Sequence, residues 1–238
     1  MKFFQGFVTR IINEIRALKS QKQKVTLSMD IKKDFLWWLE FMSVFNGVQL
    51  MIPDQVYAQI AGNACPQGMW CYNPSKNSYF SSKFPLYYQD PSIPIHLKEF
   101  MCIIIAIKKW GSLWAGCQIQ FFCDNDSVVD VITYLKPKNE LMQSYLREFL
   151  YLVCKYNFCP IASKISTREN DIADFLSRNF IIADANAFFS RLSLPIPDKI
   201  DILPEDYIFV ADWWFLGQFP QSPCLCSQNP GSLLSSRH

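Results

Sequence analysis

The sequence has little histidine and no closely spaced cysteine pair of the kind that binds zinc. It contains only two histidines, His96 and His238, and none of its nine cysteines forms a Cys-x-x-Cys pair. Structural zinc sites are usually built from four Cys or His ligands at such spacings, so we expect no zinc site with His ligands. Most of the cysteines lie among apolar residues, which predicts small buried thiols. These are Cys65, Cys71, Cys102, Cys117, Cys123, Cys154 and Cys159.

A long hydrophobic run is also missing. The longest one, Phe100–Ile107, is far shorter than the roughly 20 residues that cross a bilayer as a helix. Residues 1–24 are amphipathic and basic, and they lack the apolar centre and the cleavage site of a signal peptide. We therefore expect an intracellular protein, cytoplasmic or nuclear, with no membrane partner and with reduced thiols.

The chain has almost no net charge, because 23 Lys and Arg oppose 21 Asp and Glu. Its 238 residues are 50% hydrophobic, which excludes a disordered chain and is enough for a core of normal size. The charge is unevenly placed. Residues 1–33 hold eight basic and two acidic residues, whereas residues 169–212 hold nine acidic and three basic ones. A nucleic-acid partner and plain solvated faces both remain open.

The hydrophobic periodicity predicts an α/β fold with the element order βββαβααβα. Strands are expected at residues 56–61, 69–72, 78–81, 118–123 and 160–165, and helices at residues 96–115, 127–135, 139–157 and 170–178. The helix at 96–115 is apolar nearly all round, so it is expected to be buried. A further helix is expected at 183–192. Four tryptophans at helical spacing are expected in the core: Trp37, Trp38, Trp110 and Trp114.

Two helices precede the strands. The first covers residues 3–19, and the second begins at Ser28 or Asp30. Its expected apolar face consists of Ile31, Phe35, Trp38, Leu39 and Met42. We divide the chain into a helical connector (1–50), an α/β domain (51–180), a C-terminal extension (181–214) and a disordered tail (215–238).

Four polar residues at the ends of predicted strands or in predicted helices are candidates for a catalytic or metal-binding site. Asn63 follows the first strand, and Asp124 ends the fourth. Glu99 lies in the first turn of the buried helix, and Asp174 lies in the final helix. A charge beside a core is costly unless it is paired or binds a metal. A helix-dipole role for Glu99 and a simple Asp-Asn turn at Asp124 remain alternatives. Lys98 is expected to point away from such a site.

These residues and the strand order together carry a resemblance to a known family. The segment Asn170–Arg178 is the most specific part, and Asp124-Asn125 is the next. The chain resembles the ribonuclease H-like fold, in particular the ribonuclease H domain of DIRS-like retrotransposons, the tyrosine-recombinase group. Residues Phe35–Leu39 with Phe45–Val48 look like the segment that links the polymerase thumb to that domain.

The resemblance covers about residues 1–180 and implies a five-stranded sheet with flanking helices. It also implies four carboxylates that hold two Mg²⁺ or Mn²⁺ ions and cleave RNA in RNA·DNA hybrids. Glu99, Asp124 and Asp174 match three of these catalytic, metal-binding carboxylates, and Asn63 replaces the fourth. Asparagine lacks the negative charge, so we predict that hydrolysis is absent or severely reduced. Trp70 is bulky where the family favours a small residue.

Two further functions compete with a weakened nuclease. One is non-catalytic nucleic-acid binding, with phosphate contacts from Lys136, Lys138, Arg168 and Arg178. The other is a protein-interaction module that binds a partner through Trp213, Trp214 and Phe215 of the C-terminal part and through the exposed face of the first helix. No aromatic-x-Asp-Asp pair of the polymerase type occurs, so we expect a fragment or a surviving open reading frame. A chain with no selected function is the remaining alternative.

Overall fold

The computed structural model describes residues 26–44, 56–137, 139–166, 182–191 and 193–209, with a few residues between 11 and 24. Most of the helix expected at 3–19 lies outside the described residues, as do the helix expected at 170–178 and everything after Phe209. Asp174, Lys138, Arg168 and Arg178 therefore have no described position.

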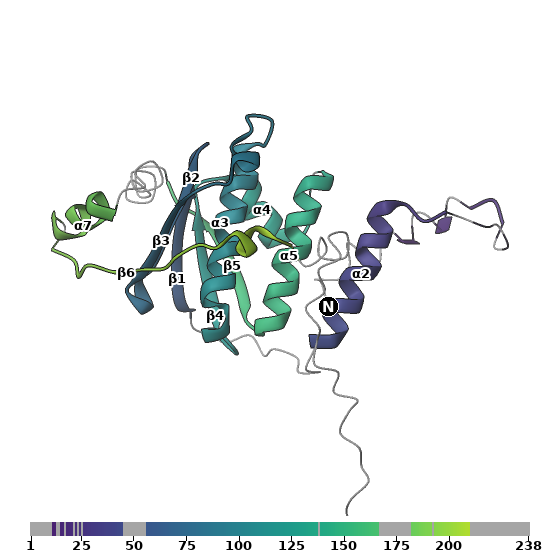
Figure 1. The fold of residues 1–238 in the computed structure, drawn as a ribbon. Coiled ribbons are helices and arrows are strands. Elements are labelled where there is room, and N and C mark those ends of the chain that lie inside the picture. Colours follow the sequence, from purple (N-terminus) through teal and green to yellow (C-terminus); the bar gives the residue numbers. More distant parts are fainter. Residues whose placement is uncertain are drawn as a thin grey trace, which may run out of the picture.

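The centre of the molecule is a mixed six-stranded sheet with the strand order β5-β4-β1-β2-β3-β6 (Figure 1). Strands β1, β4 and β5 are parallel to one another, and β2 is antiparallel to both β1 and β3. The strands are β1 (Val56–Ala64), β2 (Gly68–Asn73), β3 (Ser78–Lys83), β4 (Gln118–Cys123), β5 (Cys159–Lys164) and β6 (Asp198–Lys199). The prediction of five strands missed β6, because two residues carry no recognisable alternation of apolar and polar side chains.

Helices cover both faces of this sheet. Figure 1 shows α3 and α5 on one side, α2 outside α5, and α7 at the opposite side. The helices are α2 (Met29–Val44), α3 (Ile95–Trp110), α4 (Asp126–Tyr134), α5 (Glu140–Tyr156) and α7 (Ile182–Arg191). The described elements thus confirm the predicted order βββαβααβ and the α/β class, with most boundaries within a few residues. None of the described helices is long and apolar enough to cross a membrane.

Two asparagines start the helices that follow β4. Asn125 accepts a hydrogen bond from the Ser127 N–H (3.0 Å) at the start of α4. Asn139 accepts one from the Met142 N–H (2.8 Å) at the start of α5. Such caps satisfy backbone donors that have no partner within the helix. The connection after β4 is therefore held in a defined geometry by its own side chains.

Helix α3 is buried on all sides because it lies between the sheet and α5. Nearly all of its residues are buried, including the aliphatic run Ile103–Ile107. Trp37, Trp110 and Trp114 are also buried and Trp38 is half-buried, which confirms their placement in the core. The helix ends at Trp110, earlier than predicted, because residues Gly111–Leu113 form a 3-10 turn. Of the seven cysteines expected to be buried, Cys117, Cys154 and Cys159 are only half-buried.

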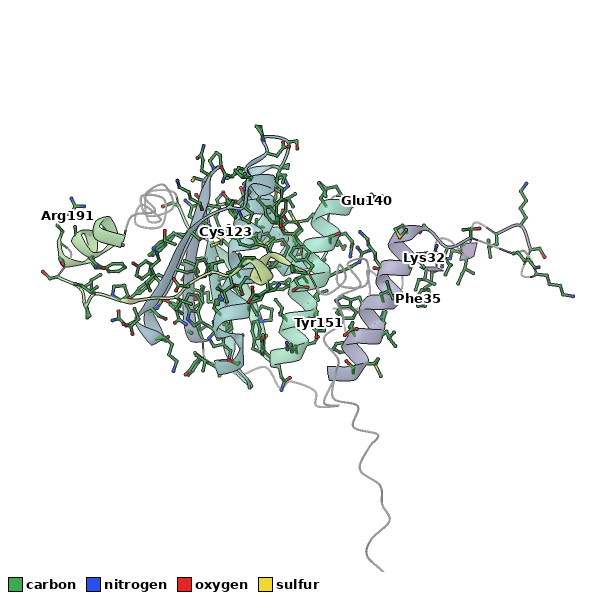
Figure 2. The ribbon with its side chains drawn as sticks, viewed as in Figure 1. Lys32, Phe35, Cys123, Glu140, Tyr151 and Arg191 are labelled. Carbon is green, nitrogen blue, oxygen red and sulfur yellow. The ribbon has the colours of Figure 1, made fainter. Side chains whose placement is uncertain are left out.

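Helix α2 packs on α5 through a buried ion pair. The Asp34 carboxylate lies 2.6 Å from the Arg147 Nε, and both side chains are inaccessible to solvent. The Trp37 Nε1–H donates to the Arg147 backbone oxygen at 2.7 Å. The predicted apolar face of this helix is therefore partly wrong. Ile31 is buried, but Phe35, Leu39 and Met42 are exposed (Figure 2 labels Phe35). The side of α2 that carries Asp34 and Trp37 faces α5. A prediction from hydrophobic periodicity places Asp34 on the exposed side of the helix, because aspartate is charged.

The segment after β6 returns to the helical side and joins the same core. The Lys108 Nζ donates to the backbone oxygens of Asp206 (3.0 Å) and Ile208 (2.7 Å). Lys109 forms an ion pair with the Asp206 carboxylate at 2.6 Å. Tyr207 and Phe209 are part of the main hydrophobic core.

Removing one partner of the Asp34–Arg147 pair should strongly destabilise the fold, because the other charge stays buried without compensation. We expect Asp34→Ala to lower the free energy of unfolding by about 3–5 kcal/mol. The double variant Asp34→Ala/Arg147→Met should recover part of this loss. Lys164→Ala, which breaks the exposed Lys164–Asp126 pair, is the control and should cost at most about 1 kcal/mol. Urea unfolding measures all four proteins, and equal costs for Asp34→Ala and Lys164→Ala would contradict the prediction.

Candidate metal and catalytic site

The carboxyl-terminal ends of β1 and β4 meet at one edge of the sheet. These neighbouring strands are parallel, and Ala61 is paired with Phe122. Asn63 and Asp124 each lie two residues beyond this pair, so both are at the same edge. Ligands of open α/β sheets commonly bind outside the carboxyl ends of the strands. The topology therefore brings together two residues that are far apart in the sequence.

Helix α3 adds a carboxylate to this edge. Glu99 lies one turn after the start of α3, where the helix packs across β1 and β2. Ligand atoms of Glu99, Cys123 and Asp124 all lie within 4.8 Å of one another. Glu99 and Cys123 are buried, and Asp124 is half-buried. The structure therefore places two of the four predicted site residues next to each other.

The Glu99 carboxyl group is in an unfavourable environment for a negative charge. Burial, and then repulsion from Asp124, raise its pKa from an ordinary 4.5 to about 8, although a hydrogen bond from the Asn125 side chain partly opposes this. The Glu99 side chain is 8% exposed, and its Oε2 atom has no hydrogen-bond partner among the described residues. A buried polar atom without a partner is rare in folded proteins and calls for a ligand or another explanation.

Asn63 lies level with Asp124 at the end of the neighbouring parallel strand. Its side chain is buried, and its Oδ1 accepts a hydrogen bond from the Ala64 N–H at 2.8 Å. Its backbone amide hydrogen-bonds to the sulfur of Cys102, which lies one turn after Glu99 on α3. A neutral amide at this position adds no negative charge to the site.

Trp70 pairs with Asn63 across the β1–β2 ladder, so both side chains project from the face of the sheet that lies away from α3. There it packs with Tyr79 and with Ala185 and Phe189 of α7. The bulky side chain therefore has a structural place on the side covered by α7.

Thiols surround the α3 side of the site. The Cys102 Sγ lies 3.2 Å from the Trp70 backbone oxygen and contacts the thiol of Cys71. Burial, followed by the charge of Glu99, raises the pKa of Cys123. Gly62 allows this packing, because a Cβ there would lie 3.0 Å from the Cys102 Sγ and 3.2 Å from the Cys71 Sγ. Any larger residue at position 62 would push on both sulfurs.

Sequence reasoning missed one residue of this region. The sequence predicts Cys123 as a small buried thiol, and it is buried, but the sequence does not show that its sulfur lies within 4.8 Å of carboxylate oxygens of Glu99 and Asp124. Lys98 is buried, and its Nζ donates to the Pro66 backbone oxygen at 3.0 Å, which does not contradict the expectation that it points away from the carboxylates. Lys98 therefore joins α3 to the β1–β2 connection that follows Asn63.

The basic residues predicted to contact nucleic acid are described only in part. Lys136 is exposed in the connection between α4 and α5. Lys138, Arg168 and Arg178 lie outside the described residues, as does the fourth predicted site residue, Asp174.

Comparison with known proteins adds no family assignment. A scan against protein-family models finds no match to this chain, and no curated protein matches it.

The raised pKa of Glu99 should make the stability of the fold depend on pH. The folded state keeps the Glu99 proton up to a pH of about 8, whereas the unfolded state releases it near 4.5. The free energy of unfolding should therefore fall as the pH rises between these values, by up to about 1.4 kcal/mol per pH unit. Glu99→Gln has no proton to lose there, so it should show a flatter profile.

Urea unfolding of the wild-type and Glu99→Gln proteins, at several pH values between 5 and 8 and in the presence of a chelator, measures this difference. Identical pH profiles would contradict the placement of an ionisable Glu99 in this environment.

Proposed function

We propose that this chain is a ribonuclease H-like domain of a retroelement reverse transcriptase polyprotein, preceded by the end of the polymerase connector. In this proposal it binds RNA·DNA hybrids through their shape and backbone, and its hydrolysis of the RNA strand is absent or severely reduced. Hybrids are recognised through A-form-like geometry, 2′-hydroxyl groups and phosphates, with little dependence on base sequence.

The observation that carries the proposal is the meeting of Glu99 and Asp124 at the carboxyl edge of a sheet with the order β5-β4-β1-β2-β3. The parallel trio β1, β4 and β5, followed on the other side by the antiparallel β2 and β3, agrees with the ribonuclease H-like arrangement that the sequence resembles. In that arrangement, a carboxylate from the helix after β3 and one at the end of β4 face each other, as these two do.

The described residues fit one divalent cation at this point. Glu99 supplies a buried oxygen that has no hydrogen-bond partner among the described residues, and Asp124 supplies a second carboxylate within 4.8 Å. Mg²⁺ and Mn²⁺ prefer such oxygen ligands and retain several waters, so few protein groups are needed. In this family a bound metal pair acidifies the attacking water and stabilises the leaving oxygen.

Asn63 is the reason for the expected loss of hydrolysis. Two divalent cations held roughly 4 Å apart repel each other strongly, and carboxylates offset that repulsion. At Asn63 the side chain is neutral, and its only acceptor oxygen already receives the Ala64 N–H. The remaining carboxylates can hold one cation more easily than two.

Restoring the carboxylate should restore cleavage. We expect Asn63→Asp to increase the rate of RNA cleavage in an RNA·DNA hybrid at least about tenfold, which corresponds to about 1.4 kcal/mol of additional transition-state stabilisation. The assay uses a labelled hybrid with Mg²⁺ and, separately, with Mn²⁺. The double variant Asn63→Asp/Glu99→Gln should lose the gain and serves as the control.

Two results would count against this part of the proposal. The wild-type chain could already turn over hybrid at the rate of an active homologue, which would contradict the predicted impairment. Asn63→Asp could produce no gain although the protein folds and binds hybrid, which would show that Asn63 is not what limits the site.

Hybrid binding should weaken steeply as salt rises, since phosphate contacts release counterions. Lys136 is the one predicted phosphate contact that the structure describes, and it is exposed. We expect Lys136→Gln to weaken binding and to reduce the salt slope by about 1. Lys76→Gln is the matched control, because Lys76 is also exposed but lies in the turn between β2 and β3, at the opposite edge of the sheet. Fluorescence anisotropy at several salt concentrations measures both, and equal slopes for the two variants would contradict the assignment.

A protein-interaction module is the second candidate, and one observation favours it. The outward side of α2 carries exposed apolar side chains at Met29, Phe35, Leu39 and Met42. Exposed apolar patches of this kind are common at protein interfaces. The salt titration separates the two functions, because a pure protein-interaction module would show no hybrid binding even at low salt.

A further inference from the structure

We propose that Cys123 is a third ligand at this site and that it shifts the metal preference from Mg²⁺ toward thiophilic divalent cations such as Zn²⁺. The inference rests on the proposed function only in that it concerns the same metal site. It goes beyond the oxygen-ligand chemistry that the resemblance implies, because it assigns a role to a sulfur atom of this chain.

The position of Cys123 follows from the alternation of β4. Ile119, Phe121 and Cys123 are buried, whereas the residues between them are half-buried. Cys123 therefore faces the interior side of the sheet together with Phe121, and Figure 2 shows it within the body of the molecule. Its Sγ lies within 4.8 Å of a carboxylate oxygen of Glu99 and of Asp124.

These spacings are close to what a metal requires. In a tetrahedral Zn²⁺ site the sulfur lies about 2.3 Å and each oxygen about 2.1 Å from the metal, so the donor atoms are roughly 3.5 Å apart. Starting within 4.8 Å, the three donor atoms need to approach one another by at most about 1.3 Å. Side-chain rotation of the two carboxylates can supply this movement without a change of the strand.

A second observation points to a ligand at the same place. The Glu99 side chain is more than nine-tenths buried, its carboxylate is directed at Cys123 and Asp124, and its Oε2 has no hydrogen-bond partner among the described residues. A cation at the centre of the three groups would give this oxygen its missing partner. It would also relieve the repulsion between the two carboxylates.

Ligand softness decides which cation is favoured. Mg²⁺ accepts oxygen ligands and gains little from sulfur, whereas Zn²⁺ binds thiolates and carboxylates alike. When Zn²⁺ binds, the Cys123 thiol releases its proton to the solvent and the sulfur coordinates as a thiolate. The neighbouring thiols of Cys71 and Cys102 are not part of the group of three metal-binding side chains that includes Cys123. Among the residues that the structure describes, no other three metal-binding side chains lie this close together, and Cys102 and Cys71 contact each other.

Titration with Co²⁺, a spectroscopic substitute for Zn²⁺, tests the assignment on the purified 238-residue chain under reducing conditions. A thiolate ligand produces a sulfur-to-cobalt charge-transfer absorption in the near ultraviolet, and oxygen ligands alone do not. We expect the wild-type chain to develop this band at one equivalent and to lose it when Zn²⁺ is added. Cys123→Ser should remove the band and weaken Zn²⁺ binding at least about tenfold. Mn²⁺ binding, measured by its paramagnetic resonance signal, should change less than about twofold.

Two controls make the result specific. Cys159→Ser removes a half-buried thiol of β5 that is not part of the cluster, and it should leave the band unchanged. Asp124→Asn leaves every cysteine in place but should reduce the band strongly, so it decides the question if Cys123→Ser does not fold. A band that persists in a folded Cys123→Ser variant, or that is unchanged in Asp124→Asn, would overturn the assignment.

The outcome is separable from that of the proposed function. Hybrid binding is measured on the same samples in the presence of a chelator, where the metal plays no part. A band that depends on Cys123 in a chain that binds no hybrid would support the metal assignment and refute the proposed function. Hybrid binding together with a band that ignores Cys123 would refute the metal assignment alone.

Discussion

The burial of α3 between the sheet and α5 is the constraint on which the rest of the structure depends. A helix that is apolar nearly all round requires cover on every side, and here the strands, α5 and the segment around Tyr207 provide it. The same burial takes Glu99 out of water and holds it against the end of β4. Packing and site chemistry therefore have a common origin, because the hydrophobic burial that holds α3 in place is also the main cause of the raised pKa of Glu99.

The elements whose own residues determine them could be predicted from the sequence. The strands around Gln118–Cys123, the buried helix and the capped helices after β4 have local patterns that match their final surroundings. The buried side of α2 could not be predicted, because it depends on Arg147, a residue more than a hundred positions away. The strand β6 was missed for a similar reason, since its two residues are defined only by pairing with Ser78 and Tyr79.

The candidate site could also be predicted only in part. Glu99 and Asp124 could be named because each is a charged residue beside strongly apolar sequence, which is costly without a specific partner. Cys123 could not, because a thiol in an apolar strand is usually a small core residue and its neighbours across the fold are invisible in the sequence. Lys98 shows the same limit, because its hydrogen bond to Pro66 depends on how the β1–β2 connection crosses α3.

The side chain of Asn125 connects the start of a helix with the acid group beside it. Its oxygen accepts the Ser127 N–H that begins α4, while its side chain also hydrogen-bonds to the carboxyl group of Glu99. The two bonds use opposite ends of one amide, so they fix which end faces the helix and which faces the carboxyl group. Aspartate is an equally good residue at the start of a helix, yet here it would lack the donor and would place a further carboxylate beside Glu99 and Asp124. Asparagine is therefore favoured over aspartate at position 125 because of the neighbouring carboxyl group of Glu99, and helix capping alone would not distinguish the two residues.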